Sequence, residues 1–288
     1  MEVKQLSAVT TTISYLGGAD KLRPLLLISD VHWDSKDCDR ALLKKHLDYA
    51  LEKDAAIVIV GDFFDLMEGR NDMRRANKAM SNHYAPNYLQ KVVMDASEWL
   101  KPYVKNIAVI SDGNHETSIT RHIQVDPLEW LCYELNKQGS PVVHGKYQGF
   151  IIVKAYIGLK DKKNASIRQY VIYYHHGLWG GVISKGTQSV MRFGAVVPDA
   201  DMVITGHTHD QWMMLHTRYK LLRNGDVKLC DQVHLKLGTY KNEFESGGGF
   251  AVEKIGLPKP IGGWFVELSM VKTDGITTIV PKCQMLKH

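Results

Sequence analysis

The chain carries the stretch LLLISDVH at positions 25–32, in which a short apolar run ends in Asp30 and His32. The same design recurs in AAIVIVGDFFD at positions 55–65 and in IAVISDGNHE at positions 107–116. A continuous apolar run of this length between polar segments is typical of a strand buried on both faces, as in a parallel sheet. These stretches therefore predict neighbouring strands whose carboxyl ends carry polar side chains.

Amphipathic segments separate these strands and follow them. Leu42, Leu43 and Leu47 recur at helical spacing, and positions 88–100 and 128–135 show the same periodicity. Strands that alternate with helices at this pace favour βαβ units around a mainly parallel sheet. The first half of the chain is therefore predicted to be of the α/β class.

The second half has the pattern of strands rather than helices. We expect strands at positions 149–155, 170–174, 202–205, 211–217, 233–237 and 264–270. Asn224-Gly225 predicts a two-residue hairpin turn, and the Gly- and Pro-rich residues 247–263 predict a long loop. An α/β half joined to a β-rich half predicts two packed sheets with helices outside, in a single domain over residues 1–288.

The composition is that of a globular protein. Of 288 residues, 44% are hydrophobic and 23% are charged, which argues against disorder. The net charge is 36 − 31 = +5, which permits a polyanionic partner without requiring one. The four cysteines include no C-x-x-C pair and are expected to be reduced. The sequence has neither a signal-peptide pattern nor a membrane-length apolar run, so we predict a cytoplasmic protein without membrane contact.

Polar clusters follow five of the predicted strands. In an open α/β sheet the carboxyl ends of the strands line the ligand crevice, so we expect these clusters to converge on one site. The clusters are Asp30-Val31-His32, Gly61-Asp62-Phe63-Phe64-Asp65, Gly113-Asn114-His115-Glu116, His175-His176-Gly177 and Gly206-His207-Thr208-His209.

The side chains in these clusters suit divalent metals. Carboxylate, imidazole and amide oxygen ligands together favour Mn, Fe or Zn over Ca or Mg. The ligands suffice for two ions, which Asp62 could bridge. Two such cations clamp the attacking and leaving oxygens of a displacement at phosphorus, and a water between them would lose its proton near neutral pH. Each cluster alone is a weak signal, whereas all five in this order are specific.

The order D-x-H, G-D-x-x-D, G-N-H-E, H-G, G-H-x-H resembles that of the calcineurin-like metallophosphoesterases over residues 25–240, with C-terminal strands and a loop in 241–288. The resemblance implies a four-layer α/β/β/α sandwich. It implies two divalent metal ions, with Mn²⁺ expected and Fe, Zn, Ni and Co as alternatives. It assigns one ion to Asp30, His32, Asp62 and His209, and the other to Asp62, Asn114, His176 and His207.

The same resemblance gives His115 and Asp62 catalytic roles. His115 would protonate the leaving group or steady the phosphoryl oxygens. Leu237-Gly238-Thr239-Tyr240 is similar to a late glycine turn of the family that packs near the site.

Two choices within the pattern follow from spacing. His175 and His176 are adjacent, and strand alternation sends them to opposite faces, so one of them is a ligand. The histidine before glycine is the ligand in the family, which favours His176. His144-Gly145 is read as structural or surface. Asp65 is expected to orient a metal ligand by a hydrogen bond rather than to bind the metal itself. The alternative for both Asp65 and Glu116 is a solvated loop carboxylate.

The wording of G-D-F-F-D and G-N-H-E is nearer to the Mre11/SbcD nuclease branch than to the protein Ser/Thr phosphatases. A lipid-precursor pyrophosphatase branch of the family tends to carry Arg where this chain has His115, which counts against that branch. Basic and aromatic residues between the motifs could bind phosphate or stack on a base, with a solvated helix face or rim packing as the alternative. The predicted substrate-binding residues are Arg70, Arg74, His83, Tyr84, Arg121 and Trp179.

The sequence thus predicts a metal-dependent phosphoric ester hydrolase acting on a phosphodiester, as a nuclease or a nucleotide phosphodiesterase. The alternatives are a phosphomonoesterase acting on a small nucleotide or other metabolite and, from another class, a non-catalytic metal-binding module. The expected partner is a phosphate-ester substrate, nucleic acid included. Nuclease members of the family often need a dimer or an ATPase partner, and no coiled-coil extension for one is visible.

Overall fold

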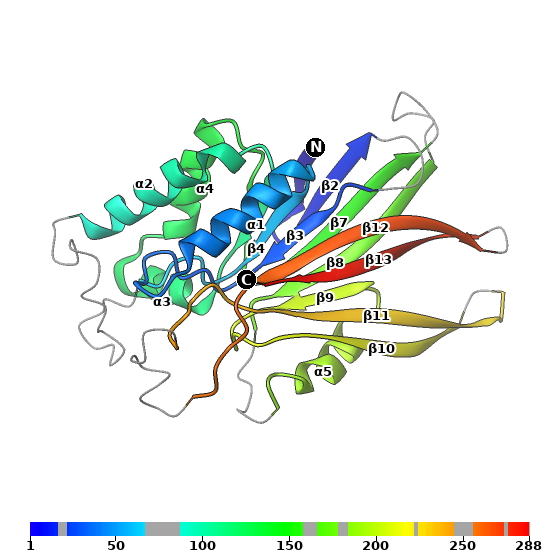
Figure 1. Cartoon of the computed structure of the whole chain (residues 1–288). Helices are drawn as coiled ribbons and strands as arrows, with labels where there is room; N and C mark the ends of the chain where they lie inside the picture. Colours follow the sequence, from blue (N-terminus) through cyan, green and yellow to red (C-terminus); the bar gives the residue numbers. More distant parts are fainter. Residues whose placement is uncertain are drawn as a thin grey trace.

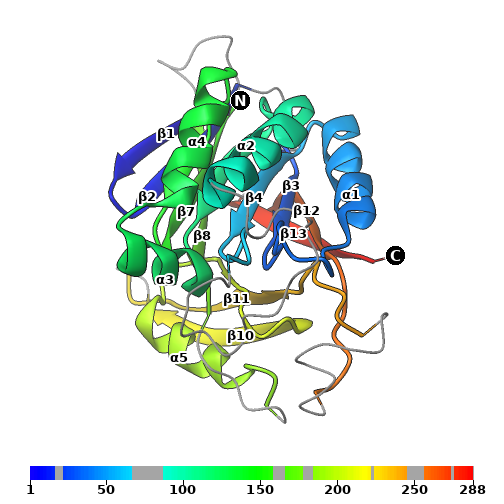
Figure 2. The ribbon, with the colours of Figure 1, turned by 90° about the vertical axis from the view of Figure 1, so that its left-hand side faces the viewer.

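The structure is a computed structural model that describes residues 1–16, 22–66, 87–157, 166–177, 184–221, 224–244, 256–273 and 276–287. Two β-sheets pack face to face, and helices cover the outer face of each (Figures 1 and 2). This is the four-layer α/β/β/α arrangement that the sequence predicts.

The first sheet has six strands. Its order is β13 (Ile276–Leu286), β12 (Gly263–Thr273), β3 (Leu25–Ile28), β4 (Ala56–Val60), β5 (Ile107–Ser111), β6 (Val143–Gly145). Strands β3 to β6 are parallel, and β12 joins β3 antiparallel, so the sheet is mixed. The three apolar stretches predicted as neighbouring strands are β3, β4 and β5, and they do lie side by side.

The second sheet has seven strands and is also mixed. Its order is β1 (Glu2–Ser7), β2 (Thr10–Leu16), β7 (Gln148–Ile157), β8 (Ser166–His175), β9 (Met202–Thr205), β11 (Val227–Leu237), β10 (Gln211–Leu221). Strands β8, β9 and β11 run parallel, which brings the ends of β8 and β9 to one edge. The hairpins β10–β11 and β12–β13 both extend away from the helical end of the molecule (Figure 1).

Helices α1 (Arg40–Glu52), α2 (Tyr88–Leu100) and α4 (Pro127–Lys137) cover the six-stranded sheet, and α5 (Gln188–Val196) covers the other sheet (Figure 2). Helix α3 (Asn114–Ile123) lies at the end where the strands terminate. A short 3-10 turn, Lys101–Tyr103, follows α2. Helix α1 begins where the Asp39 side chain accepts a hydrogen bond from the Leu42 amide at 2.8 Å.

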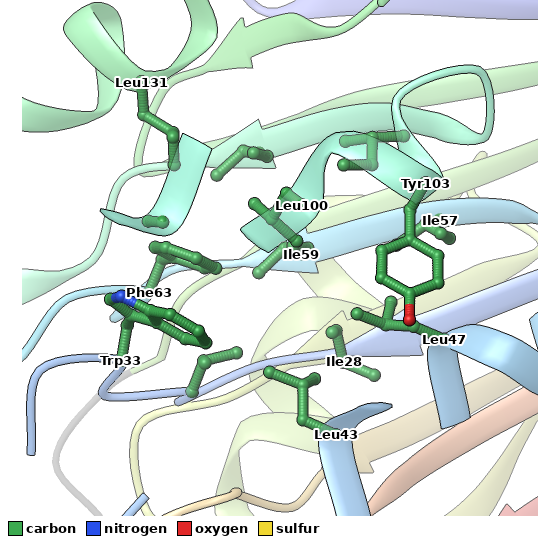
Figure 3. Close-up of a cluster of buried hydrophobic side chains, with 14 of the residues drawn as sticks. Ile28, Trp33, Leu43, Leu47, Ile57, Ile59, Phe63, Leu100, Tyr103 and Leu131 are labelled. Carbon is green, nitrogen blue, oxygen red and sulfur yellow. The ribbon is translucent and has the colours of Figure 1, made fainter. Parts of the chain in front are cut away.

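Alternating side chains of β3 supply both cores. Leu26 and Ile28 pack toward the helices, whereas Leu25 and Leu27 pack between the two sheets. The helix-side core holds Ile28 against aliphatic and aromatic side chains that include Leu43, Leu47, Ile57, Ile59 and Phe63 (Figure 3). Burial on both faces is the reason that β3, β4 and β5 read as continuous apolar runs rather than alternating ones.

Several elements agree with the predictions and others were not predicted. The structure has a helix at Tyr88–Leu100 and a strand at Met202–Thr205, as expected. The β1–β2 hairpin, β13 and α5 were not predicted, because their residues are partly exposed and carry weak periodicity. The two-residue turn at Asn224-Gly225 is wrong, since Leu221 pairs with Val227 and five residues lie between them.

Two other expectations concern covalent and membrane state. All four cysteines, Cys38, Cys132, Cys230 and Cys283, are free thiols. Among the described residues no helix has the length and apolar character needed to cross a membrane.

Candidate metal centre

The predicted ligands lie just beyond the ends of the core strands. Asp30 and His32 follow β3, Asp62 follows β4, and Asn114 begins α3 directly after β5. From the other sheet, His176 follows β8, and His207 and His209 occupy the link between β9 and β10. Parallel strands end at the same edge of a sheet, so the packing of two sheets brings both sets to one end of the molecule.

The first group of side chains consists of Asp30, His32 and His209. Their ligand atoms all lie within 4.8 Å of one another. His32 Nε2 is 3.2 Å from His209 Nε2, which is in turn 3.3 Å from Asp30 Oδ1. Asp30 and His32 are almost fully buried, at 0% and 1% exposure. The three ligand atoms therefore surround a common point and are already positioned to bind a cation there.

The second group consists of Asp62, His176 and His207, joined by Asn114. The ligand atoms of the two histidines and the aspartate lie within 4.8 Å of one another. His176 Nε2 is 3.1 Å from Asp62 Oδ2. Asn114 Oδ1 is 2.8 Å from His207 Nδ1 and 3.0 Å from His176 Nε2. These four side chains are the set that the resemblance assigns to the second ion.

The two ligand groups adjoin each other through Asp30 and His207. Asp30 Oδ2 accepts a hydrogen bond from the His207 amide at 2.9 Å, so the first group is tied to the loop of the second. A third overlapping set, His32, Asp65 and His115, also has ligand atoms within 4.8 Å. His115 Nε2 lies 3.7 Å from Asp62 Oδ2, and its ring meets that of His32 edge to face at 4.7 Å. His115 therefore lies at the junction of both groups.

Backbone strain is concentrated in the same residues. Asp30, His32, Asp62, His207 and His209 have φ values of 51°, 50°, 48°, 74° and 57°. Residues other than glycine seldom adopt this left-handed conformation, and such strain gathers where geometry serves function. The turns aim the side chains at one centre rather than along the strands.

Glycines in the motifs are required by close approach. A β-carbon at Gly113 would overlap the Asp62 carboxylate, and one at Gly206 would overlap Ser29 Oγ and the Asp30 carboxylate. The glycine of G-N-H and the glycine of G-H-x-H therefore let two ligand loops approach the aspartates of two other loops.

Hydrogen bonds behind the ligands orient their rings. His32 Nδ1 is 2.8 Å from Asp65 Oδ1, which also accepts from Lys241 Nζ at 3.1 Å. His176 Nδ1 donates to the Val60 carbonyl at 3.1 Å, leaving Nε2 directed at Asp62. Such partners set the tautomer and direction of a metal-binding imidazole. Asp65 thus has the position expected of an orienting group, and it is buried rather than solvated.

Two buried carboxylates, Glu116 and Asp34, hold the loops by hydrogen bonds to backbone amides. Sequence reasoning did not identify this role for either. Glu116 is 1% exposed and accepts from the amides of Asp62, Phe64 and Gly113 at 3.1, 2.9 and 2.9 Å. The alternative that Glu116 is a solvated loop carboxylate is wrong. Asp34 accepts from the amides of Asp65 and Leu66 at 2.6 and 2.9 Å. The sequence signal that could have identified Asp34 is its position two residues after the Asp30-Val31-His32 cluster.

The electrostatics fit a cation. Asp30 Oδ1 is buried and makes no hydrogen bond within the described part of the chain, although a buried carboxylate oxygen normally has a partner. Burial lowers the pKa of His32 and of His207 to about 4, so both are neutral imidazoles, the form that binds metal. Carboxylate, imidazole and amide oxygen ligands together suit a divalent transition metal.

Several other predicted positions can be placed. His175 points to the opposite face from His176, where its ring packs against Phe193 at 5.4 Å. His144 lies outside both groups, with Nε2 2.7 Å from Asp112 Oδ1. Arg121 is exposed in the last turn of α3. The remaining predicted substrate residues fall outside the described residues; they are Arg70, Arg74, His83, Tyr84 and Trp179.

Comparisons with known proteins show what the chain is similar to. In solved structures the chain is similar to vacuolar protein sorting 29 from Cryptosporidium parvum, at 15% identity and a TM-score of 0.40, covering 93% of this chain and 100% of that chain. It is also similar to an uncharacterised protein, described as a predicted phosphoesterase, from Streptococcus pneumoniae, at 13% identity and a TM-score of 0.35, covering 92% and 99%. No curated protein matches the sequence.

The family model for the calcineurin-like phosphoesterases matches residues 23–211. That range contains every predicted ligand from Asp30 to His209 and ends at the first residue of β10. The chain therefore belongs to the calcineurin-like phosphoesterase family.

Proposed function

We propose that this protein hydrolyses phosphodiester bonds, in a nucleic acid or a nucleotide, with the help of two divalent cations. The observation that carries the proposal is the pair of adjoining ligand groups, Asp30–His32–His209 and Asp62–Asn114–His176–His207, linked by the bond between Asp30 and the His207 amide. A pair of cations, when bound, activates water and neutralises charge that develops on the phosphoryl oxygens.

The chain's own residues would position and exchange protons around that reaction. His115 Nδ1 donates to the Asp65 carbonyl at 2.5 Å, so Nε2 is the nitrogen left to exchange a proton with the substrate. The His115 amide donates to Asp62 Oδ1 at 3.0 Å, which couples the position of this imidazole to that of the aspartate. His115 therefore suits the role of a general acid toward the leaving oxygen.

The preference for a diester comes from two motifs and from charge. The wording of Gly61–Asp65 and Gly113–Glu116 resembles the nuclease branch of the family, and the net charge of +5 favours a polyanionic substrate. Manganese is the expected ion, because mixed oxygen and imidazole ligands suit it.

The test begins with metal content and hydrolysis. Protein loaded with Mn²⁺ should hydrolyse bis-p-nitrophenyl phosphate faster than p-nitrophenyl phosphate, and should be screened on single- and double-stranded DNA, RNA and cyclic nucleotides. Turnover of a nucleic acid should fall steeply with salt, because its binding releases counterions. Faster turnover of monoesters would make the enzyme a phosphomonoesterase. Bound metal with no turnover of any ester would reduce it to a metal-binding module.

A further inference from the structure

Lys236, on β11, is a buried lysine whose ammonium group has no hydrogen-bond or ion-pair partner among the described residues. The residue is 1% exposed, and the charges that act on its Nζ are those of Asp30, Asp210 and Lys259. Its neighbours Leu235 and Leu237 point into the core between the sheets, so strand alternation directs Lys236 to the outer face. The nearby carboxylate of Asp210 is bound by Lys259 at 3.1 Å instead. A buried, unpaired charge is costly, so this position calls for an explanation.

A second unpartnered group borders the same space. Thr208 Oγ1 is buried and has no hydrogen-bond partner. A β-carbon placed on Gly186 would lie 3.3 Å from Lys236 Nζ and 3.6 Å from Thr208 Oγ1. The two polar atoms therefore lie close to one position beside Gly186, where a side chain would crowd Lys236 Nζ. The segment above it is anchored, because Trp212 Nε1 donates to the Lys185 carbonyl at 3.0 Å.

This space adjoins the metal centre. Thr208 lies between His207 and His209 in the chain, and Lys236 pairs with Thr205 at the end of β9. The charge of Asp30 acts on Lys236 from the centre. Two divalent cations would neutralise the aspartates there, and the ammonium would then be left with Asp210, which Lys259 already pairs. An anion beside the centre would restore the balance.

We propose that Lys236 Nζ and Thr208 Oγ1 form an anion subsite that holds a phosphate oxygen of the substrate beside the metal centre. Both groups can donate a hydrogen bond, and the ammonium serves as the point charge that phosphate oxygens favour. A water molecule could accept from both groups but would not balance the charge. The inference rests on the proposed function for the identity of the anion.

Inorganic phosphate is the probe, titrated calorimetrically into Mn²⁺-loaded protein. Lys236→Met keeps the length of the stem and should weaken phosphate binding about 10–100-fold, the value of a charge-assisted hydrogen bond. Thr208→Val should weaken it about 3–10-fold, the value of a neutral hydrogen bond. The matched control is Lys228→Met, which removes an exposed lysine of the same strand and should change phosphate affinity less than about 2-fold.

Thermal stability separates a binding role from a structural one. Removal of a buried unpaired charge should leave the melting temperature of metal-free Lys236→Met equal to that of the wild type or higher. Weakened phosphate binding at unreduced stability supports the subsite. Unchanged phosphate affinity in Lys236→Met, or no phosphate binding by the wild type, overturns it. If Lys236→Met melts lower, Thr208→Val decides: weaker binding at unchanged stability supports the subsite and unchanged affinity overturns it.

The same titration keeps the two proposals apart. If no ester is hydrolysed but phosphate binding depends on Lys236, the proposed function fails and the subsite stands. If esters are hydrolysed while Lys236→Met binds phosphate like the wild type, only the subsite fails.

Discussion

The carboxylate of Glu116 holds the backbone amide of Asp62 at 3.1 Å, 54 positions away in the chain. The same oxygen accepts from the Gly113 amide at 2.9 Å, and the other accepts from Phe64. One buried side chain thus fixes the loop after β4 to the start of α3. We call these three hydrogen bonds to Glu116 the clasp. Asp62 contacts both His115 and His176, and its position depends on the clasp.

Replacement of Glu116 by glutamine should loosen both loops. An amide NH₂ would face a backbone N–H where an oxygen now accepts, so we expect a loss of about 1–3 kcal/mol in the free energy of unfolding and a 10–100-fold loss of metal affinity. Urea denaturation and Mn²⁺ titration measure the two effects. Glu129→Gln, exposed on α4, is the control and should change stability by less than about 0.5 kcal/mol. Equal behaviour of the two variants would contradict the clasp.

Asp62→Asn should weaken both metal sites together. Its Oδ2 lies 3.1 Å from His176 of the second group and 3.7 Å from His115, whose ring contacts His32 of the first group. Elemental analysis of purified protein should show loss of both equivalents of metal. Asp65→Asn is the comparison, because Asp65 orients only His32 of the first group and should weaken one site more than the other. Retention of one full equivalent by Asp62→Asn would show that this carboxylate does not bridge.

His115→Ala should keep both metals and lose about 10²–10⁴-fold in turnover, because general acid catalysis is worth that much. Steady-state kinetics on a substrate with a poor leaving group measures the loss. His122→Ala, exposed about two turns later on α3, is the matched control and should be active. Loss of a metal equivalent in His115→Ala would instead identify His115 as a ligand, a role that its place in the set with His32 and Asp65 would allow.

Metal removal should destabilise the protein. The strained turns, and Asp30 Oδ1 without a hydrogen bond in the described part of the chain, are tolerated for a ligand that binds only the folded state. A cation at 100 times its Kd adds about 2.7 kcal/mol, which corresponds to about 4–5 °C in melting temperature for a chain of this size. Thermal melts with chelator and with Mn²⁺ give the difference. Identical melting temperatures at saturating metal would speak against a preformed centre.

Stability should depend on pH through Lys236. Burial lowers the pKa of this lysine to about 8 from its usual 10.5, so the folded state disfavours the charged form. The unfolded chain binds more protons between these two values, and the free energy of unfolding therefore rises with pH across that window. In metal-free protein, the advantage of Lys236→Met over the wild type, at most about 3 kcal/mol, should be full below pH 8 and vanish above 10.5. A difference that is constant with pH would refute the burial of a charged lysine.

The sequence by itself determined where the strands β3, β4 and β5 lie in the chain and the identity of the side chains at their ends. Both are local properties: an apolar run such as Leu25–Ile28 specifies a buried strand, and the residue after it must leave the core. Strand alternation allows only one of His175 and His176 on a face, and the resemblance to the family, in which the ligand histidine precedes glycine, indicated His176.

Only the tertiary structure decided which polar side chains support that set. Glu116 and Lys236 resemble ordinary surface residues in the sequence, and they are buried because distant segments close over them. Burial and hydrogen-bond partners depend on contacts between residues far apart in the chain, which no local pattern encodes. The packing of one sheet on the other, which brings Asp30 against His207, is such a contact.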